Sequence, residues 1–169
     1  QCPKIIQRFS GCNKNMKIDI KLLKKLREET GASIADCRKA LEETGSKYDK
    51  AIEWLKIHGI EKAEKKEGRQ TAQGLVESYI HQNGKVGVLL TILCETDFVA
   101  RTDDFKHLAH EVAMQIAAMN PKNIDTLLKQ EYIRDGSLTI EQLVKQTIAK
   151  LGENIRVKAF TRYELDSND

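Results

Sequence analysis

Two histidines and a glutamate form the most obvious cluster of chemically capable side chains in the sequence: His107, His110 and Glu111. Histidines three positions apart on one helix can bind the same metal ion. The metalloprotease motif, however, has the order H-E-x-x-H, and no second histidine follows His110 at the distance that this motif requires. The pattern therefore predicts two histidines on the solvent side of a helix rather than a metal site.

The sequence lacks the common signatures of nucleotide binding and of nucleophilic catalysis. It contains no G-x-x-x-x-G-K-S/T loop for phosphates and no G-x-S-x-G turn for a nucleophilic serine. No two of its four cysteines have the C-x-x-C spacing of a zinc or redox site. The motifs therefore give no indication of covalent chemistry. Cys37 and Cys94 lie in apolar patterns and are expected to be small core residues in a reducing compartment.

The segment Thr96–Ala100 is short, lies between an apolar run and a helical pattern, and places Phe98 beside Asp97. Two interpretations fit this arrangement. In the first, Phe98 fills the core while Asp97 or Thr102 caps the following helix. In the second, Phe98 is the tip of a rigid turn that inserts, with the adjacent carboxylate, into another protein. Spacing alone favours the first interpretation.

Residues 17–58 contain three short helical patterns. Their apolar residues recur at helical spacing, and we expect the helices to begin near Ile20, Ser33 and Ser46 and to end before Gly31, Gly45 and Gly59. A core of this size is marginal by itself. Such a three-helix unit is therefore typical of a docking module rather than of an enzyme.

Residues 59–73 are nearly all polar, with alternating charges at helical spacing, which predicts a solvated helical linker. Three lysines in this segment are candidates for binding phosphate: Lys62, Lys65 and Lys66. A spacer between two domains is the favoured interpretation, because alternating charges usually face solvent.

From Gly74 onward the pattern changes to strands and longer helices. Two apolar runs, Leu75–His81 and Val86–Cys94, flank an Asn83-Gly84 pair that favours a hairpin. Helical patterns follow at Asp103–Met119, at Ile124–Lys129, and from the capping residue Thr139 to Gly152.

The last strand has apolar or small residues at alternating positions, which predicts that one face lies on the core: Ile155, Val157, Ala159, Thr161, Tyr163 and Leu165. Together these patterns predict an α+β domain with a three-stranded antiparallel sheet and helices on one side.

The overall charge argues against a nucleic-acid partner. The 169 residues include 28 Lys and Arg against 25 Asp and Glu, a net charge of +3, and 5% aromatic residues. Proteins that bind nucleic acid usually carry a stronger basic field and more aromatic residues for stacking. No apolar run is long enough to cross a membrane. We therefore expect a protein partner.

Residues 1–16 match none of these patterns and are expected to be a flexible leader. They lack the long apolar centre of a secretory signal. Because they contain Lys4, Arg8 and Lys14 and no acidic residue, a remnant of an organellar transit peptide over residues 1–15 stays open.

Four segments carry a resemblance to a known family. They are the turn Thr96-Asp97-Phe98-Val99-Ala100 and residues 26–41 (LREETGASIADCRKAL), 62–66 (KAEKK) and 149–155 (AKLGENI). Taken in their order along the chain, the four segments resemble elongation factor Ts, the family of guanine nucleotide exchange factors of elongation factor Tu. The resemblance covers about residues 17–165.

The resemblance implies a ubiquitin-associated-like three-helix module over residues 17–58, a charged linker over 59–73 and a core domain over 74–169. Only about 20 residues separate Met119 from Thr139, which leaves no room for the duplicated core half and coiled-coil insertion of long members. The chain is thus similar to the compact members with a single core half, for which a homodimer through the core sheet is expected.

The resemblance also implies roles for particular residues. Asp97 and Phe98 would enter the GTPase domain of elongation factor Tu near its magnesium and phosphate site. The helical module would dock on the same domain through Arg27, Ile34, Ala35 and Arg38. Ala35 is smaller than the usual family residue and would bury less area there. The chain would hold no cofactor and perform no covalent chemistry, since it acts on the GDP and magnesium of its partner.

Two other functions stay open at this point. The three-helix module could belong to a non-catalytic adaptor that binds ubiquitin or another peptide. Alternatively, an RNA-binding protein could use Lys62, Lys65, Lys66 and Arg69, although the near-balanced charge argues against it. A member of the resembled family is expected in a bacterial-type cytoplasm, or in an organelle if residues 1–15 are a transit remnant.

Overall fold

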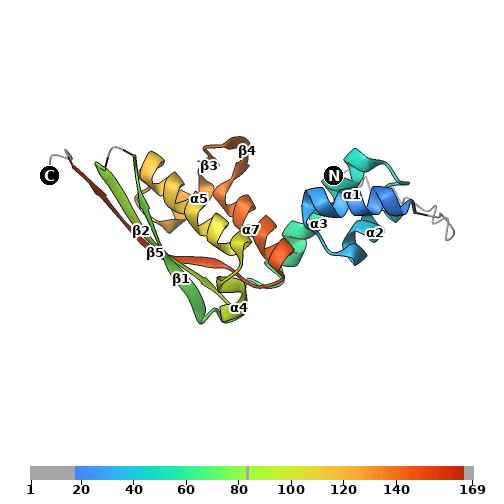
Figure 1. The fold of residues 1–169 in the computed structure, drawn as a ribbon, viewed down its shortest axis with the longest axis horizontal. Coiled ribbons are helices and arrows are strands. Elements are labelled where there is room, and N and C mark those ends of the chain that lie inside the picture. Colours follow the sequence, from blue (N-terminus) through green and yellow to red (C-terminus); the bar gives the residue numbers. More distant parts are fainter. Residues whose placement is uncertain (1–17, 83, 166–169) are drawn as a thin grey trace, which may run out of the picture. The chain divides into compact units, whose positions relative to one another are not determined.

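The computed structural model describes residues 18–82 and 84–165 (Figure 1). Within these ranges the chain divides into two compact units, one that ends at Leu55 and one that begins at Lys56. Each unit has its own cluster of buried apolar side chains. The expected leader over residues 1–16 lies outside the described residues, as do Cys2, Cys12 and Asn83.

The first unit contains α1 (Ile20–Thr30), α2 (Ile34–Glu43) and the first part of α3 (Tyr48–Glu64), which continues into the second unit after Leu55. Side-chain caps begin the first two, since the Asp19 carboxylate accepts a hydrogen bond from Lys21 N and the Ser33 hydroxyl accepts one from Asp36 N. Gly31 ends α1 with a left-handed φ of 65°. The predicted starts of α1 and α2 and the stop at Gly31 are confirmed.

The core of the first unit is small, and its fully buried side chains are Leu26, Cys37, Ala40, Leu41 and Ala51. The helices are also joined at the surface, where the Tyr48 hydroxyl donates a hydrogen bond to the Glu29 carboxylate. This bond to Glu29 raises the pKa of Tyr48 to about 12. The predicted burial of Cys37 is confirmed.

The end of α3 corrects the sequence prediction, which stopped the third helix before Gly59. The helix continues through Gly59 to Glu64. A Cβ at Gly59 would lie 3.2 Å from the Cβ of Ala149, which belongs to α7 (Ile140–Leu151). The glycine therefore permits close packing of two helices and does not end a helix.

Within the described residues of the second unit, three strands form an antiparallel sheet in the order β1 (Gln73–Ile80), β2 (Val86–Cys94) and β5 (Arg156–Glu164). β1 and β2 form a hairpin in which Ile80 pairs with Gly87. Gly84 has a φ of 68° in the connecting turn, as expected for the glycine of an Asn-Gly pair. The predicted sheet is confirmed.

Helices cover one face of this sheet (Figure 1). They are α4 (Asp97–Ala100), α5 (Asp103–Met119), α6 (Ile124–Lys129) and α7. Thr139 begins α7 with a capping box and Gly152 ends it with a φ of 81°. The predictions for α5, α6 and α7 are confirmed, as is the α+β fold class, whereas the short helix α4 was not expected from the sequence.

The main core lies between α5 and β2. Both elements contribute side chains that are buried almost completely: Phe105, Leu108, Val112 and Ile116 from α5, and Val88, Leu90, Ile92 and Cys94 from β2. The predicted apolar stripe of α5 and the predicted burial of Cys94 are confirmed.

A β-bulge interrupts the alternation of β5. Thr91 of β2 pairs with Ala159, but the next residue, Ile92, pairs with Val157. Lys158 is therefore an extra residue in β5 that has no partner in the pairing.

Beyond the bulge the two faces of β5 change places, and this corrects the sequence prediction. Val157 is buried before the bulge, but after it Phe160 packs on the core while Tyr163 is 68% exposed. The predicted placement of four residues on the core face is wrong: Ala159, Thr161, Tyr163 and Leu165. One inserted residue shifts every following side chain to the opposite face.

A second, two-stranded sheet was not expected from the sequence and consists of β3 (Glu131–Tyr132) and β4 (Asp135–Thr139). Buried polar groups of α5 hold its hairpin. Glu111, which is 2% exposed, accepts a hydrogen bond from the Tyr132 hydroxyl and forms an ion pair with Arg134, whose Nε lies 3.1 Å from the carboxylate. Gln115 accepts one from Ile133 N at 3.0 Å. These bonds satisfy polar side chains that would be costly to bury unpaired.

Candidate functional site

The turn Thr96–Ala100 contains the short helix α4. The Thr96 hydroxyl begins it by accepting a hydrogen bond from Val99 N at 3.4 Å. The next helix, α5, begins three residues after the end of α4. The Thr102 hydroxyl links the two helices, since it donates to Val99 O at 2.8 Å and accepts from Phe105 N at 3.3 Å. Of the two capping residues considered from the sequence, Thr102 is therefore the cap of α5, and Asp97 is not.

The side chain of Phe98 is 81% exposed, so the interpretation that it fills the core is wrong. α4 has two sides. Val99 and Ala100 are partly buried against the core, whereas Asp97 and Phe98 face solvent. Burial of a phenylalanine side chain stabilises a protein by about 1.5–3 kcal/mol. The exposed side chain of Phe98 gains none of this free energy within its own unit and remains available for burial by another protein.

Asp97 forms an ion pair with Arg101, with 2.9 Å between Oδ2 and Nη2. Both side chains are more than half exposed, at 51% and 79%. Exposed pairs of this kind contribute little to stability, at most about 1 kcal/mol. The carboxylate of Asp97 can therefore exchange Arg101 for a group on another molecule at small cost.

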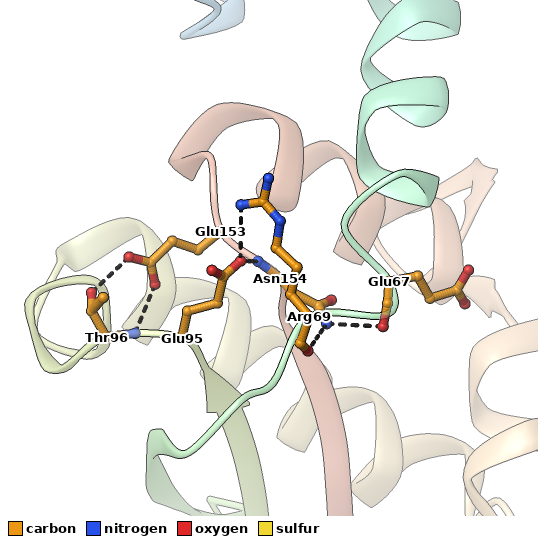
Figure 2. Close-up of polar contacts among 6 residues, drawn as sticks. All are labelled: Glu67, Arg69, Glu95, Thr96, Glu153 and Asn154. Atoms are coloured by element: carbon orange, nitrogen blue, oxygen red, sulfur yellow. Dashed lines mark hydrogen bonds and ion pairs between the residues drawn. The ribbon is translucent and has the colours of Figure 1, made fainter.

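Residues far away in the sequence support the turn (Figure 2). Glu153, which directly follows Gly152 at the end of α7, accepts hydrogen bonds from Thr96 N at 3.0 Å and from the Thr96 hydroxyl at 2.6 Å. In the opposite direction, the Glu95 carboxylate accepts one from Asn154 N at 2.6 Å. Each glutamate thus binds the backbone of the other segment, which forms a two-way clasp between residues 95–96 and 153–154.

Asn154 fixes its side of the clasp to a third segment. Its side chain is 4% exposed, and its Nδ2 donates to Glu67 O at 3.1 Å and to Arg69 O at 2.9 Å (Figure 2). The guanidinium of Arg69 in turn lies 3.6 Å from the Glu95 carboxylate. Sequence analysis assigned no role to Glu95, Glu153 or Asn154, and no local pattern could have paired residues 57 and 59 positions apart.

The expected docking residues of the first unit all lie at its surface. Ile34 is 52% exposed on α2, next to the exposed Ala35 and one turn before Arg38. Arg38 forms an ion pair with Glu42 at 2.9 Å. Arg27 is exposed in the last turn of α1. Their accessibility is compatible with docking, and their use by a partner stays a prediction.

The histidine cluster forms part of the surface of α5. The side chain of His107 is 70% exposed and that of His110 is 46% exposed, with His110 Nδ1 3.2 Å from Glu77 Oε1. Across residues 18–82 and 84–165, no three His, Cys, Asp or Glu side chains are placed to hold a metal ion. The helices in the same ranges include none with the length and apolar character needed to span a bilayer.

An exposed aromatic side chain on a supported turn, together with exposed apolar residues on a small helical module, is typical of a protein that acts by binding another protein. Comparison with known proteins agrees with this class. The family model for elongation factor Ts matches residues 95–169, and the model described as the N-terminal part of mitochondrial elongation factor Ts matches residues 7–66.

Similar proteins carry the same name. The chain is 46% identical to elongation factor Ts of Rippkaea orientalis, with 88% of this chain and 78% of the relative covered. It is 43% identical to that of Coprothermobacter proteolyticus, with 89% and 99% covered. It is 44% identical to that of a Synechocystis strain, with 88% and 89% covered. The chain belongs to the elongation factor Ts family and is a translation elongation factor.

The alignments also show how this chain differs from its relatives. Each of these three spans 195 residues, which exceeds the full 169 residues of this chain. The relatives therefore contain residues within the matched stretch that have no counterpart here.

Proposed function

We propose that this chain binds elongation factor Tu in its GDP-bound form and promotes the release of GDP without covalent chemistry. The exposed Phe98 on a supported helical turn carries the proposal. The turn Thr96–Ala100, called the exchange turn from here on, would insert Asp97 and Phe98 near the magnesium and phosphate site of the partner. The chain would need no cofactor of its own.

The thermodynamic requirement is a difference in affinity between two states of the partner. A factor that binds the nucleotide-free GTPase more tightly than the GDP-bound form must, by linkage, weaken the binding of GDP by the same ratio. A contact that is equal in both states would shift nothing. Phe98 meets this requirement if the pocket that buries it opens only when the ligands of magnesium and phosphate move away.

Asp97 adds an electrostatic contribution. Its carboxylate carries a negative charge at the tip of the turn and forms an exposed ion pair with Arg101. A negative charge brought near the phosphates of GDP raises the free energy of the nucleotide-bound complex. In the nucleotide-free complex the same charge can accept hydrogen bonds from groups that had bound magnesium or phosphate.

The first unit would supply attachment. Arg27, Ile34, Ala35 and Arg38 would dock on the GTPase domain of the partner. Two linked contacts raise the effective concentration of the second contact once the first has formed. Docking through the module would therefore lower the concentration of the chain that exchange requires, while the exchange turn would set the maximal rate. Because such a factor works where proteins are synthesised, we place it in a bacterial-type cytoplasm or a translating organelle.

A fluorescent GDP analogue bound to elongation factor Tu tests this function directly. We expect the release of mant-GDP to accelerate in proportion to added chain and then to saturate. An unchanged release rate over the whole titration would exclude exchange activity. A parallel titration against ubiquitin separates the adaptor function, since an adaptor would bind ubiquitin and leave the release of mant-GDP unchanged.

We also propose that a second copy of the chain covers the open face of the sheet. Paired residues on this face form rows across the three strands: Ile80–Gly87–Tyr163, Ser78–Leu89–Thr161 and Val76–Thr91–Ala159. None of these residues is charged, and Val76, Ile80, Leu89 and Tyr163 are at least half exposed. Two such faces can pack as a sheet-on-sheet sandwich that buries uncharged surface on both sides.

Sedimentation equilibrium tests the homodimer. The parental chain should have twice the mass of one chain, and Tyr163→Glu, which puts a charge into the proposed contact, should have the mass of one. Lys158→Glu on the same strand is the control, because the bulge residue belongs to none of the paired rows. A parental chain that remains monomeric at high concentration would exclude this contact.

A further inference from the structure

The helix α4 is too short to hold its own conformation. It has four residues, and isolated helical segments of this length are unstable, because the entropy lost in ordering the first turn outweighs the free energy of its first hydrogen bonds. Val99 and Ala100 anchor it only partly, since both are partly buried. The direction in which Asp97 and Phe98 point must therefore be fixed by contacts outside the helix.

The capping hydroxyl of Thr96 is where these outside contacts act. A hydroxyl has one proton to donate and lone pairs with which to accept. Thr96 gives its proton to Glu153 Oε1 at 2.6 Å and accepts from Val99 N at 3.4 Å. The bond to the Glu153 carboxylate is short and charge-assisted, so it is the stronger of these two hydrogen bonds. It turns the lone pairs of the hydroxyl toward Val99 N and thus sets the cap of α4.

Glu153 fixes the backbone of the same residue as well. Its second oxygen accepts from Thr96 N at 3.0 Å, so a single carboxylate takes both hydrogen-bond donors of Thr96. The glutamate is itself held on a rigid turn, because it stands between the left-handed Gly152 and the buried Asn154. The reciprocal bond from Asn154 N to Glu95 closes the clasp (Figure 2).

We propose that Glu153 is a positioning residue for nucleotide exchange. It makes no contact with the partner in this proposal. It acts through Thr96, by holding the start of α4 so that Asp97 and Phe98 are presented in one orientation before binding. Preorganisation of this kind saves the free energy of ordering the turn during insertion. The proposal rests on the proposed exchange function.

The test compares the parental chain with its variants in the release of mant-GDP from elongation factor Tu over a range of chain concentrations. Glu153→Gln keeps the size of the side chain, but its amide would donate to the Thr96 hydroxyl and so reverse the direction of that bond. We expect the maximal rate to fall about tenfold, with the half-saturating concentration unchanged. Thr96→Val removes the hydroxyl and should have a similar effect.

Two comparisons separate positioning from a general loss of stability. Glu141→Gln removes an acid from the first turn of α7, at the end of the helix opposite Glu153, where Glu141 pairs with Lys145, and should leave the maximal rate at the parental value. The double variant Glu153→Gln with Thr96→Val should be no slower than Thr96→Val alone, because both changes remove the same interaction. A fold defect would instead lower the thermal midpoint and raise the half-saturating concentration.

The outcomes distinguish this proposal from the function on which it rests. If the parental chain releases mant-GDP and Glu153→Gln has the parental maximal rate, the positioning role is excluded while exchange stands. Additive losses in the double variant would also exclude it. If the parental chain itself fails to release mant-GDP, the exchange function falls, and the positioning role falls with it.

Discussion

The exchange turn and the exposed face of α2 are held in place in different ways. The exchange turn contains a helix of four residues. Thr96 caps this helix and donates a hydrogen bond to Glu153, which lies 57 positions away. α2 has 10 residues and is capped by Ser33, three positions before the amide that it binds. The surface of α2 is thus specified locally, whereas the orientation of the exchange turn depends on tertiary contacts.

From this difference we infer that the exposed face of α2 would serve attachment and the exchange turn would promote nucleotide release. A surface specified by one helix can be preserved in a small module that is stable by local signals, which suits attachment. The orientation of a turn that is fixed by distant residues depends on the folded second unit. Such a rigid turn suits the insertion step, in which Asp97 and Phe98 would change the conformation of the partner. Changes at Phe98, Leu41 and Arg27 should therefore affect either the maximal rate of exchange or the concentration that exchange requires, but not both equally.

The largest effect is expected from Phe98→Ala. The maximal rate of mant-GDP release should fall roughly 30-fold or more, because aromatic anchors at interfaces typically contribute about 2 kcal/mol or more. The thermal midpoint should stay the same, since the side chain is 81% exposed in the free chain.

Met119→Ala is the matched control for Phe98→Ala, because it truncates a large apolar side chain that is 51% exposed at the end of α5. Its release kinetics should equal those of the parental chain. A parental maximal rate in Phe98→Ala would end the role assigned to the exchange turn.

A somewhat smaller effect on exchange is expected from Leu41→Ala, which empties the core of the first unit. Leu41 is fully buried, and truncation of buried leucines costs about 2–5 kcal/mol, enough to unfold a module of this size. The half-saturating concentration for mant-GDP release should rise about tenfold while the maximal rate is kept. A maximal rate as low as that of Phe98→Ala would contradict the division of roles.

Arg27→Glu should have a still smaller effect, confined to affinity. Reversing an exposed charge at a docking surface should weaken binding to elongation factor Tu a few-fold at low salt, and the effect should shrink as salt screens the charges. Lys50→Glu makes the same charge change on α3 of the module and should leave the affinity unchanged. Equal affinities of Arg27→Glu and the parental chain at low salt would remove Arg27 from the docking surface.

Tyr132→Phe should leave exchange unchanged and lower only the stability of the second unit. The partly buried phenol donates a hydrogen bond to the Glu111 carboxylate, and burial, reinforced by this bond, raises the pKa of Tyr132 to about 12. Loss of the bond should lower the free energy of unfolding by about 1–2 kcal/mol near neutral pH. Tyr163→Phe removes a hydroxyl from the open sheet face and should cost no stability, because Tyr163 is 68% exposed.

The pH dependence of this last comparison follows from the direction of the shift. A pKa raised above the unfolded value means that the folded state favours the protonated phenol, so the stabilisation is complete below about pH 10. It is lost as the pH rises toward the folded pKa of about 12. Unfolding by urea at several pH values should therefore show the difference between parent and Tyr132→Phe shrinking above pH 10. A constant difference would contradict the assigned bond.

The amino-acid sequence by itself determined the elements that depend on local signals. Caps such as Ser33 and Thr139, left-handed glycines such as Gly31, and apolar residues at helical spacing define helix positions through interactions within a few residues. The same holds for the β1–β2 hairpin. Four short segments in the order of the family were sufficient to identify the family, because such motifs can be compared without knowledge of the fold.

Only the tertiary structure decided which side several residues face and what supports them. Gly59 lies inside a helix because it packs against Ala149, and the bulge at Lys158 moves Tyr163 to the open face. Phe98 points to solvent because Val99 and Ala100, on the other side of the same short helix, take the contacts with the core. These outcomes depend on contacts between segments far apart in the chain, whose energies no local pattern of residues contains.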